Sequence, residues 1–499
     1  MAGDGAPRRP AWCNPYRPEC RPNFEWPPVP RTVWQIQQEP SQVGGETPTR
    51  QGSSAAHGPR LRGIVPPPRV FGRQWLLKDG VIMCRAWLAV VLALLAALPA
   101  AAEPEVEPWS RWRGAKGAGD GGERQFPMEW DVADASWIAG VPGRGHASPV
   151  IRAGRIYTAS ADEEASKRFV TCHSLADGKA LWSREIPGPI DRHHVQNSSA
   201  SGSVAVGDEG VYWMWAAGDG LRVEAFTLEG QPTWHVDLGP YEGEHGFGGS
   251  AAVCGDLLIV PNDQEGASFV VALDAATGDE RWRLPRESGK SGYATPLVID
   301  GPAGPQIVLT SNAHGVTGID AATGRVLWER KCLPKRAVSS PVLAGPLAIG
   351  TSGDGGGDTT LVAVRLPVVA AAAEPIEPEL VFRLDRSAAP YVPTPLAVGE
   401  RLYLWGDRGV VTCVDAATGE VRWRGRVGGT FSASPIAVGG TIRNVSADGE
   451  VVTLADGDEF EVLGRATLGE ECRATPAVVG GRMVFRTASR LIALDAESP

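Results

Sequence analysis

Three polar loops contain residues whose types could bind a metal ion or move a proton. The loops contain the imidazoles of His146, His193, His194 and His245 and the amide of Asn197, and we expect the Asp263 carboxylate, outside these loops, to lie near them. Neutral imidazoles beside a carboxylate suit zinc or another transition metal, and an imidazole can also act as a general base. Their spacing matches no metal-binding motif. Two interpretations therefore stay open: the loops converge on a ligand, or each histidine bonds within its own loop or faces solvent.

Motifs that would define a reaction do not occur in the sequence. Five widely separated cysteines follow residue 102, and none belongs to a C-x-x-C motif, a haem-attachment motif or an adjacent pair. This argues against a structural zinc site, a dithiol redox pair and a covalently bound haem. The serines that precede prolines do not lie in a G-x-S-x-G setting, so a hydrolase triad has no support. By motif alone, catalytic residues are unknown and no metal is predicted.

The charge of the chain is unevenly distributed. Residues 1–102 carry a net charge of +6 within a total of -10, which leaves -16 for residues 103–499. An acidic body of this size repels phosphate backbones, so nucleic-acid binding is not expected. The 62 glycines and the low charged fraction of 21% favour an all-β chain rich in turns.

The first hundred residues predict export. Residues 83–102 combine a Met, a single positive charge, an apolar core and the small residues Ala100 and Ala102, which are the features of a signal peptide cleaved after Ala102. Residues 1–82 are rich in Pro and Arg and lack apolar periodicity, so we expect a disordered extension or a translation start at Met83. If Met1 is the true start, the apolar segment could be a membrane anchor. Cys84 precedes the apolar core and is not placed like a lipid-anchor cysteine.

A repeated unit fills the rest of the chain. Its second half is a strand, an Asp-x-x-Thr-Gly turn and a strand with an aromatic residue, and it is clearest in residues 271–282, 318–328 and 413–423. Asp can bond the turn backbone and Gly can adopt positive φ. The first half opens with a small residue, usually followed by Pro: Ser148, Thr295, Ser340, Thr394, Ser434 and Thr475, with divergent openings near Ser203 and Ser250. Eight openings, each followed by four short strands, predict an eight-bladed β-propeller over residues 103–499.

The ends of the repeat predict how the ring closes. The eighth unit ends at residue 499 without an aromatic strand, and residues 135–140 supply one before the first unit. An N-terminal strand would then complete the last blade and leave no free edge. We expect blade-docking aromatics at Trp137, Trp182, Trp234, Trp282, Trp328 and Trp423, with Phe382 and Phe460 in the two remaining units.

The Ala-x-Thr-Gly-x-x-x-Trp unit resembles the pyrroloquinoline-quinone (PQQ) repeat family, which includes quinoprotein alcohol dehydrogenases and BamB-type assembly lipoproteins. The segments Trp109–Gly114, His245–Ser250 and Val260–Gln264 are most similar to secreted, non-lipidated propellers of planctomycete-type bacteria. This resemblance implies the fold and an extracytoplasmic location. It would imply PQQ with calcium for an enzyme, but the adjacent cysteines that contact the quinone in the dehydrogenases are missing here.

These observations together favour binding over catalysis. We expect a periplasmic or secreted monomeric scaffold that engages an envelope protein, peptide or glycan through its loop face, without a lipid anchor. The alternatives are a PQQ- or metal-dependent oxidoreductase and a BamB-like factor in outer-membrane protein assembly. Fold alone does not choose among them.

Overall fold

The computed structural model describes residues 109–114, 116–218, 220–355, 357–368 and 374–497. The predicted signal peptide and the extension before it lie outside these residues. Among the described residues, no helix is long and apolar enough to cross a membrane. The one helical element of the described chain is a 3-10 turn, η1 (Val132–Asp134), which is capped by the Asp131 carboxylate.

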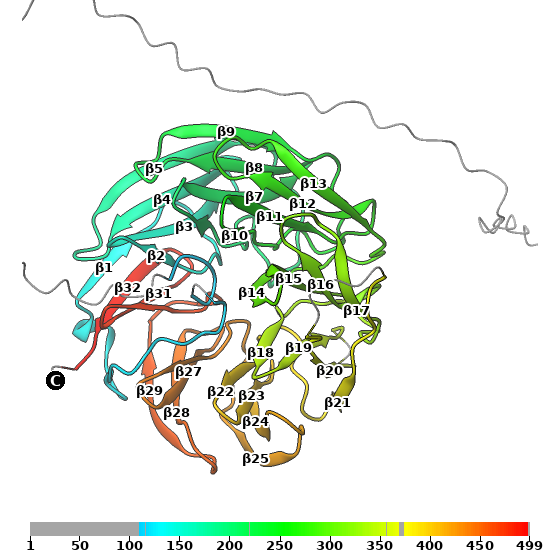
Figure 1. Ribbon diagram of the computed structural model, residues 1–499. Coiled ribbons are helices and arrows are strands. Elements are labelled where there is room, and N and C mark those ends of the chain that lie inside the picture. The colour runs from blue at the N-terminus through cyan, green and yellow to red at the C-terminus, as the bar shows by residue number, and fades with distance from the viewer. Residues whose placement is uncertain (1–108, 115, 219, 356, 369–373, 498–499) are drawn as a thin grey trace, which may run out of the picture.

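The described strands form eight antiparallel sheets of four strands arranged around a central channel, as the repeat predicts (Figure 1). The strands of the first four blades, from the channel outward, are β2 (Val150–Arg152), β3 (Arg155–Asp162), β4 (Lys167–Ser174) and β5 (Ala180–Pro187); β6 (Ala205–Val206), β7 (Val211–Ala217), β8 (Gly220–Phe226) and β9 (Pro232–Asp237); β10 (Ala252–Cys254), β11 (Leu257–Asn262), β12 (Ser268–Asp274) and β13 (Glu280–Arg286); β14 (Leu297–Gly301), β15 (Gly304–Ser311), β16 (Gly315–Asp320) and β17 (Val326–Arg330).

The other four blades continue the same order. Their strands are β18 (Val342–Ala344), β19 (Leu347–Ser352), β20 (Thr360–Arg365) and β21 (Leu380–Asp385); β22 (Leu396–Val398), β23 (Arg401–Trp405), β24 (Val410–Asp415) and β25 (Val421–Arg426); β26 (Ile436–Val438), β27 (Thr441–Val445), β28 (Glu450–Ala455) and β29 (Val462–Thr467); β30 (Ala477–Val479), β31 (Arg482–Arg486), β32 (Arg490–Asp495) and β1 (Trp137–Gly140).

The ring closes at the eighth blade with a strand from the start of the propeller. β1 pairs antiparallel with β32, in the register Trp137↔Ala493 to Gly140↔Arg490. The two strands lie side by side in Figure 1, one cyan and one red. Pairing the first strand with the last satisfies backbone groups that an open ring would expose, and the predicted closure is confirmed.

The outer-strand tryptophans link each blade to the next. Five of them donate Nε1–H to a backbone carbonyl of the following blade at 2.9–3.1 Å: Trp137 to Leu175, Trp182 to Leu228, Trp234 to Ala275, Trp282 to Ala321 and Trp423 to Gly457. The turn glycine of the following blade leaves room for the indole. At Gly278, φ is +75° and a Cβ would approach Trp234 to 2.7 Å. Each link therefore joins a repeated aromatic to a repeated turn.

On the strand next to the outer strand, a small residue recurs opposite the tryptophan. Trp182 lies opposite Cys172, Trp282 opposite Ala272 and Trp423 opposite Cys413. Cys172 and Cys413 are both buried at this position, where a small side chain leaves room for the indole.

The fourth, fifth and seventh blades depart from this pattern. Trp328 bonds Gln306 Oε1 of its own blade at 3.1 Å, and Phe382 occupies the tryptophan register in the fifth blade. The expectation for Phe460 is wrong. Phe460 precedes β29 and packs on Trp423 of the preceding blade, with ring centroids 5.5 Å apart. The position that holds tryptophan in other blades is occupied by Gly464, opposite Thr453.

The N-terminal segment accounts for that glycine. A Cβ on Gly464 would lie 2.3 Å from the carbonyl oxygen of Met128, so the segment occupies the space of the missing indole. The buried Arg443 side chain holds the same segment by donating to the carbonyls of Phe126 and Pro127 at 2.7 and 2.9 Å. In the seventh blade, the N-terminal segment around Met128 thus fills the space that a tryptophan fills in other blades.

Candidate functional site

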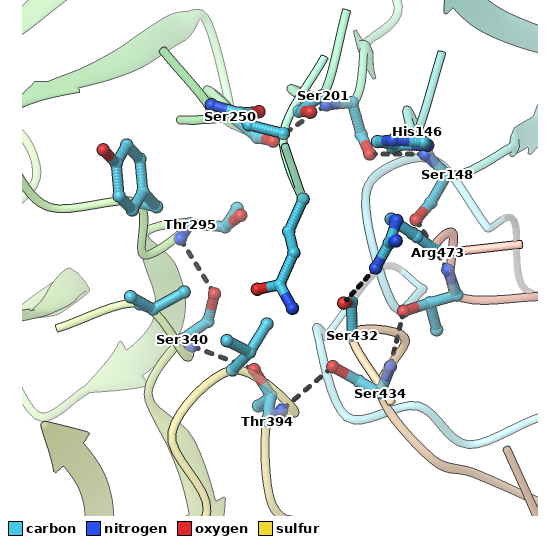
Figure 2. Close-up of a pocket in the computed structure, with 18 of the residues that line it drawn as sticks. His146, Ser148, Ser201, Ser250, Thr295, Ser340, Thr394, Ser432, Ser434 and Arg473 are labelled. Carbon is cyan, nitrogen blue, oxygen red and sulfur yellow. Dashed lines mark hydrogen bonds between the residues drawn. The ribbon is translucent and has the colours of Figure 1, made fainter. Parts of the chain in front are cut away.

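A cavity of about 300 Å³ lies in the central channel, where the blades meet. Its lining residues come from the loops before the innermost strands, together with Trp112 of the N-terminal segment and Gly355 from the turn between β19 and β20. Figure 2 shows the hydroxyl side chains around this cavity, with His146 and Arg473 on one side and Thr295 and Ser340 on the other.

The eight repeat openings form a ring of hydroxyls around the cavity. Its members are Ser148, Ser203, Ser250, Thr295, Ser340, Thr394, Ser434 and Thr475, all buried. A backbone N–H in one blade donates to the hydroxyl oxygen of the next blade at 2.8–3.0 Å, and seven such bonds are present, including Thr475 to Ser148 across the seam (Figure 2). Each of these seven hydroxyls accepts a backbone bond and keeps its own proton for a further partner.

The N-terminal segment closes one end of the channel. Arg111 donates to the carbonyl of Pro296 at 2.7 Å, and Arg113 donates to the carbonyls of Pro395 and Pro435 at 2.9 and 3.0 Å. These prolines directly follow ring residues, whereas the histidine loops precede them. Trp112 therefore lies at the floor of the cavity and the histidine loops lie at its mouth.

Arg111 and Arg113, the two floor arginines, are buried, and neither forms an ion pair with a carboxylate of the described residues. Desolvation lowers the pKa of Arg111 to about 10 and that of Arg113 to about 9. Their guanidinium groups are held by backbone carbonyls, and the described residues include no ion pair for either one. Arg113 donates through both terminal nitrogens and Arg111 through one.

The polar wall of the cavity consists of His146 and Arg473. Burial lowers the pKa of His146 to about 4, and the nearby positive charge of Arg473 lowers it further. His146 is therefore a neutral imidazole at pH 7. Arg473 donates to Ser432 Oγ at 3.4 Å, and no carboxylate of the described residues forms an ion pair with it. Its charge remains available to a ligand.

The next two loops meet at the mouth. The rings of His194 and His245 lie 5.4 Å apart edge to face, and His194 Nδ1 accepts the backbone N–H of Gln196 at 3.2 Å. A neutral His194 that accepts at Nδ1 carries its proton on Nε2. The Asn197 amide donates to the carbonyls of His245 and Phe247 at 2.9 and 3.1 Å, which ties the two loops together.

Four of the six candidate residues named from the sequence line the cavity: His146, His194, Asn197 and His245. The other two lie elsewhere. His193 pairs with Glu163 through Nε2 at 2.9 Å and lines a smaller neighbouring pocket. Asp263 forms a buried ion pair with Arg286, at 2.9 Å between Oδ1 and Nε. These contacts give His193 and Asp263 local partners away from the cavity.

The opposite wall of the cavity is mostly apolar. Tyr293, Val338, Tyr391 and Val392 line it from the fourth, fifth and sixth blades. The Tyr293 hydroxyl donates to the carbonyl of Gly246 at 3.1 Å, and the Asp407 carboxylate accepts the backbone N–H groups of Tyr391 and Val392. A cation on one side and fixed aromatic surface on the other give the cavity two chemically different walls.

The donors around the cavity do not fit a calcium-bridged quinone. None of the described lining residues is Asp or Glu, and calcium in proteins is bound mainly by carboxylate and carbonyl oxygens. The chain also has no adjacent cysteines. Across the described residues, no group of three or more His, Cys, Asp or Glu side chains is placed to hold a metal ion.

The fold and the closed channel define an eight-bladed propeller with a single-ended central cavity. A family model described as outer membrane protein assembly factor BamB matches residues 219–366 and 382–498, which is more than half of the chain. The chain therefore belongs to this family of PQQ-repeat propellers, as the sequence motif predicts. A search of curated proteins gave no significant match.

Solved structures agree with this fold. BamB from Moraxella catarrhalis is 16% identical, with 72% of this chain and 98% of that chain covered and a TM-score of 0.52. Quinohemoprotein alcohol dehydrogenase from Comamonas testosteroni is 14% identical, with 82% and 83% covered and the same TM-score. The designed protein Ika8 is 13% identical, with 72% and 98% covered and a TM-score of 0.50. A BamB, an alcohol dehydrogenase and a designed protein share the architecture, so the likeness concerns fold alone.

Sequence reasoning missed Arg473, the hydroxyl ring and the floor. The ring could have been found, because its members open every repeat at the same position. The partners of Arg113 are 282 and 322 residues away in the sequence, and no local pattern indicates such contacts.

Proposed function

We propose that this protein is an exported binding component of the cell envelope, which takes a polar group of its partner into the cavity at its loop face. The observation that supports the proposal best is the combination of a closed floor with a polar wall that lacks carboxylates. Concave sites with apolar lining and a few fixed polar groups are typical of ligand recognition. Export is supported by the signal-like residues 83–102.

The family favours a partner that is itself part of the envelope. The matching family model is described by the name of an outer membrane protein assembly factor, and such a factor acts with other proteins. A propeller is a rigid support, and the loops at the cavity mouth are tied to one another by Asn197. Binding can therefore use a site that is already formed, at a low cost in conformational entropy.

Blocking the cavity mouth tests this proposal. Gln196 lines the cavity, and no side-chain hydrogen bond of it is present among the described residues, so Gln196→Trp adds bulk without removing a contact of the fold. Its neighbour Val195 is 84% exposed and does not line the cavity, which makes Val195→Trp the matched control.

Tagged full-length chains would be used to capture ligands from an envelope extract of the source cells. We expect the unmodified chain and the Val195→Trp variant to capture the same partner, and the Gln196→Trp variant to lose it. Equal capture by both variants would show that the partner does not use the cavity and would overturn the proposal.

A further inference from the structure

The cavity carries a positive charge within an acidic protein. Residues 103–499 have a net charge of -16, yet Arg473 lines the cavity and Asp and Glu are absent from its described lining. The structure shows many other arginines in ion pairs or on backbone carbonyls, while the Arg473 guanidinium reaches one hydroxyl at 3.4 Å. A partly buried guanidinium in this state pairs well with a carboxylate, because its N–H groups match the two carboxylate oxygens.

The hydroxyl ring adds a second requirement on the ligand. Ser148 accepts the backbone N–H of Thr475, and Thr475 accepts that of Ser434, each with one lone pair. What these hydroxyls offer to the cavity is therefore an O–H donor and a remaining lone pair. Groups that both donate and accept at many positions are matched best by a ligand with several hydroxyls. A ligand with a single carboxylate and an apolar body would leave most of the ring without a partner.

The third requirement comes from the wall opposite Arg473. The rings of Tyr293 and Tyr391 and the side chains of Val338 and Val392 offer flat and apolar surface. A pyranose ring presents C–H groups on its faces and hydroxyls on its edges, so it can contact apolar surface and hydroxyls at the same time. The cavity volume of about 300 Å³ lies at the lower end of the range for small-molecule sites.

We propose that the cavity binds a carboxylated sugar, a uronic-acid residue, whose carboxylate pairs with Arg473 and whose hydroxyls bond the ring of Ser and Thr side chains. This inference rests on the proposed function and names its ligand. The same chemistry can come from a free uronic acid or from the end of an acidic polysaccharide chain.

Calorimetric titration of the full chain tests this inference. The probes are galacturonate, a galacturonate oligosaccharide, glucose as the neutral sugar, and a short peptide with a free C-terminal carboxylate. We expect galacturonate to bind and glucose to bind at least tenfold more weakly. Tighter binding of the oligosaccharide would identify a chain end as the source, and equal binding would identify the free acid; either result supports a carboxylated sugar. Binding of the peptide without galacturonate, or no binding of galacturonate, would overturn the inference.

Arg473 variants test the role of the charge. Arg473→Gln should weaken galacturonate binding about tenfold to hundredfold and leave glucose binding unchanged, since hydrogen bonds to charged groups are the strong ones. Arg473→Lys should recover part of the affinity. The control is Arg408→Gln, which removes the same charge from an exposed loop residue outside the cavity. Unchanged galacturonate binding in Arg473→Gln would contradict the assignment. If galacturonate fails to bind while Gln196→Trp still abolishes partner capture, the proposed function stands and the sugar assignment falls.

Discussion

The floor and the wall of the channel both use arginine, and they use it differently. Arg113, at the floor, is buried, and its guanidinium donates to two carbonyl groups of neighbouring blades. Arg473, at the wall, is partly exposed and donates to one hydroxyl at long distance. The first residue holds the fold together and the second is available to a ligand. The hydrogen bonds that the protein itself makes to the guanidinium group, more than burial or charge alone, separate a structural arginine from a binding one.

A third arginine clarifies the contrast. Arg286 is buried and pairs with Asp263, which the sequence had suggested as a ligand residue. Its charge is neutralised within one blade by a carboxylate, whereas the floor arginines rely on carbonyl dipoles. Arg286 and Arg113 should therefore both matter for stability, and Arg473 should matter for binding.

The largest effect is expected when the buried ion pair is broken. Asp263→Ala leaves the Arg286 guanidinium buried without its counter-charge and should lower the free energy of unfolding by about 3–5 kcal/mol. Denaturant unfolding followed by circular dichroism would measure the loss. A change of less than about 1 kcal/mol would show that this pair is not a structural element and would reopen a ligand role for Asp263.

A smaller loss is expected at the floor. Arg113→Ala leaves the carbonyls of Pro395 and Pro435 without a donor and should cost about 2–4 kcal/mol, because each buried polar group left unsatisfied is penalised. The same unfolding measurement applies. Wild-type stability in this variant would mean that the N-terminal segment does not hold the floor.

The third effect depends on pH. The pKa of His146 is about 4 in the folded chain and near 6.5 when unfolded, so the unfolded chain binds the proton more tightly. Stability should therefore fall as the pH drops from 6.5 to 4, by about 3 kcal/mol, and should not depend on this group above pH 7. His146→Gln should remove this part of the pH profile. Arg473→Gln should reduce it, because the arginine charge lowers the pKa of His146. An identical acid response in all three chains would contradict this assignment.

The smallest effect on stability is expected at the wall. Arg473→Gln removes one long hydrogen bond and no ion pair, so the free energy of unfolding should stay within about 0.5 kcal/mol of the wild-type value. Thermal unfolding of the two chains side by side would measure the difference. A loss as large as that in Arg113→Ala would show that Arg473 is a structural residue as well, and the contrast between wall and floor would fail.

The fold could be predicted because its information is local and repeated. The Asp-x-x-Thr-Gly turn and the aromatic strand recur in register, and Trp137 identified the strand that closes the ring. Phe460 was misassigned because the sequence shows an aromatic near the expected position, while the true register residue, Gly464, has no side chain to recognise. Its indole space is filled by Met128, which lies far away in the sequence.

The candidate site could be predicted only in part. The loops of His146, His194 and His245 were placed on one face because they precede successive innermost strands, and all three line the cavity. Asp263 looked similar in the sequence, but β12 and β13 bring Arg286 to it. Arg473 lies two residues before the repeat opening at Thr475, but nothing in the sequence sets it apart from the other arginines. Its role as a binding residue depends on the lack of Asp and Glu among the described residues that line the cavity, and only the folded ring shows which residues those are.

The most direct test of the account is a crystal structure of the full chain grown with galacturonate. We predict density for one sugar above Trp112, with its carboxylate within hydrogen-bond distance of the Arg473 guanidinium and its hydroxyls facing the Ser and Thr ring. Arg111 and Arg113 should keep their bonds to the proline carbonyls. A sugar bound elsewhere on the propeller, or a carboxylate held by the floor arginines instead of Arg473, would contradict the account.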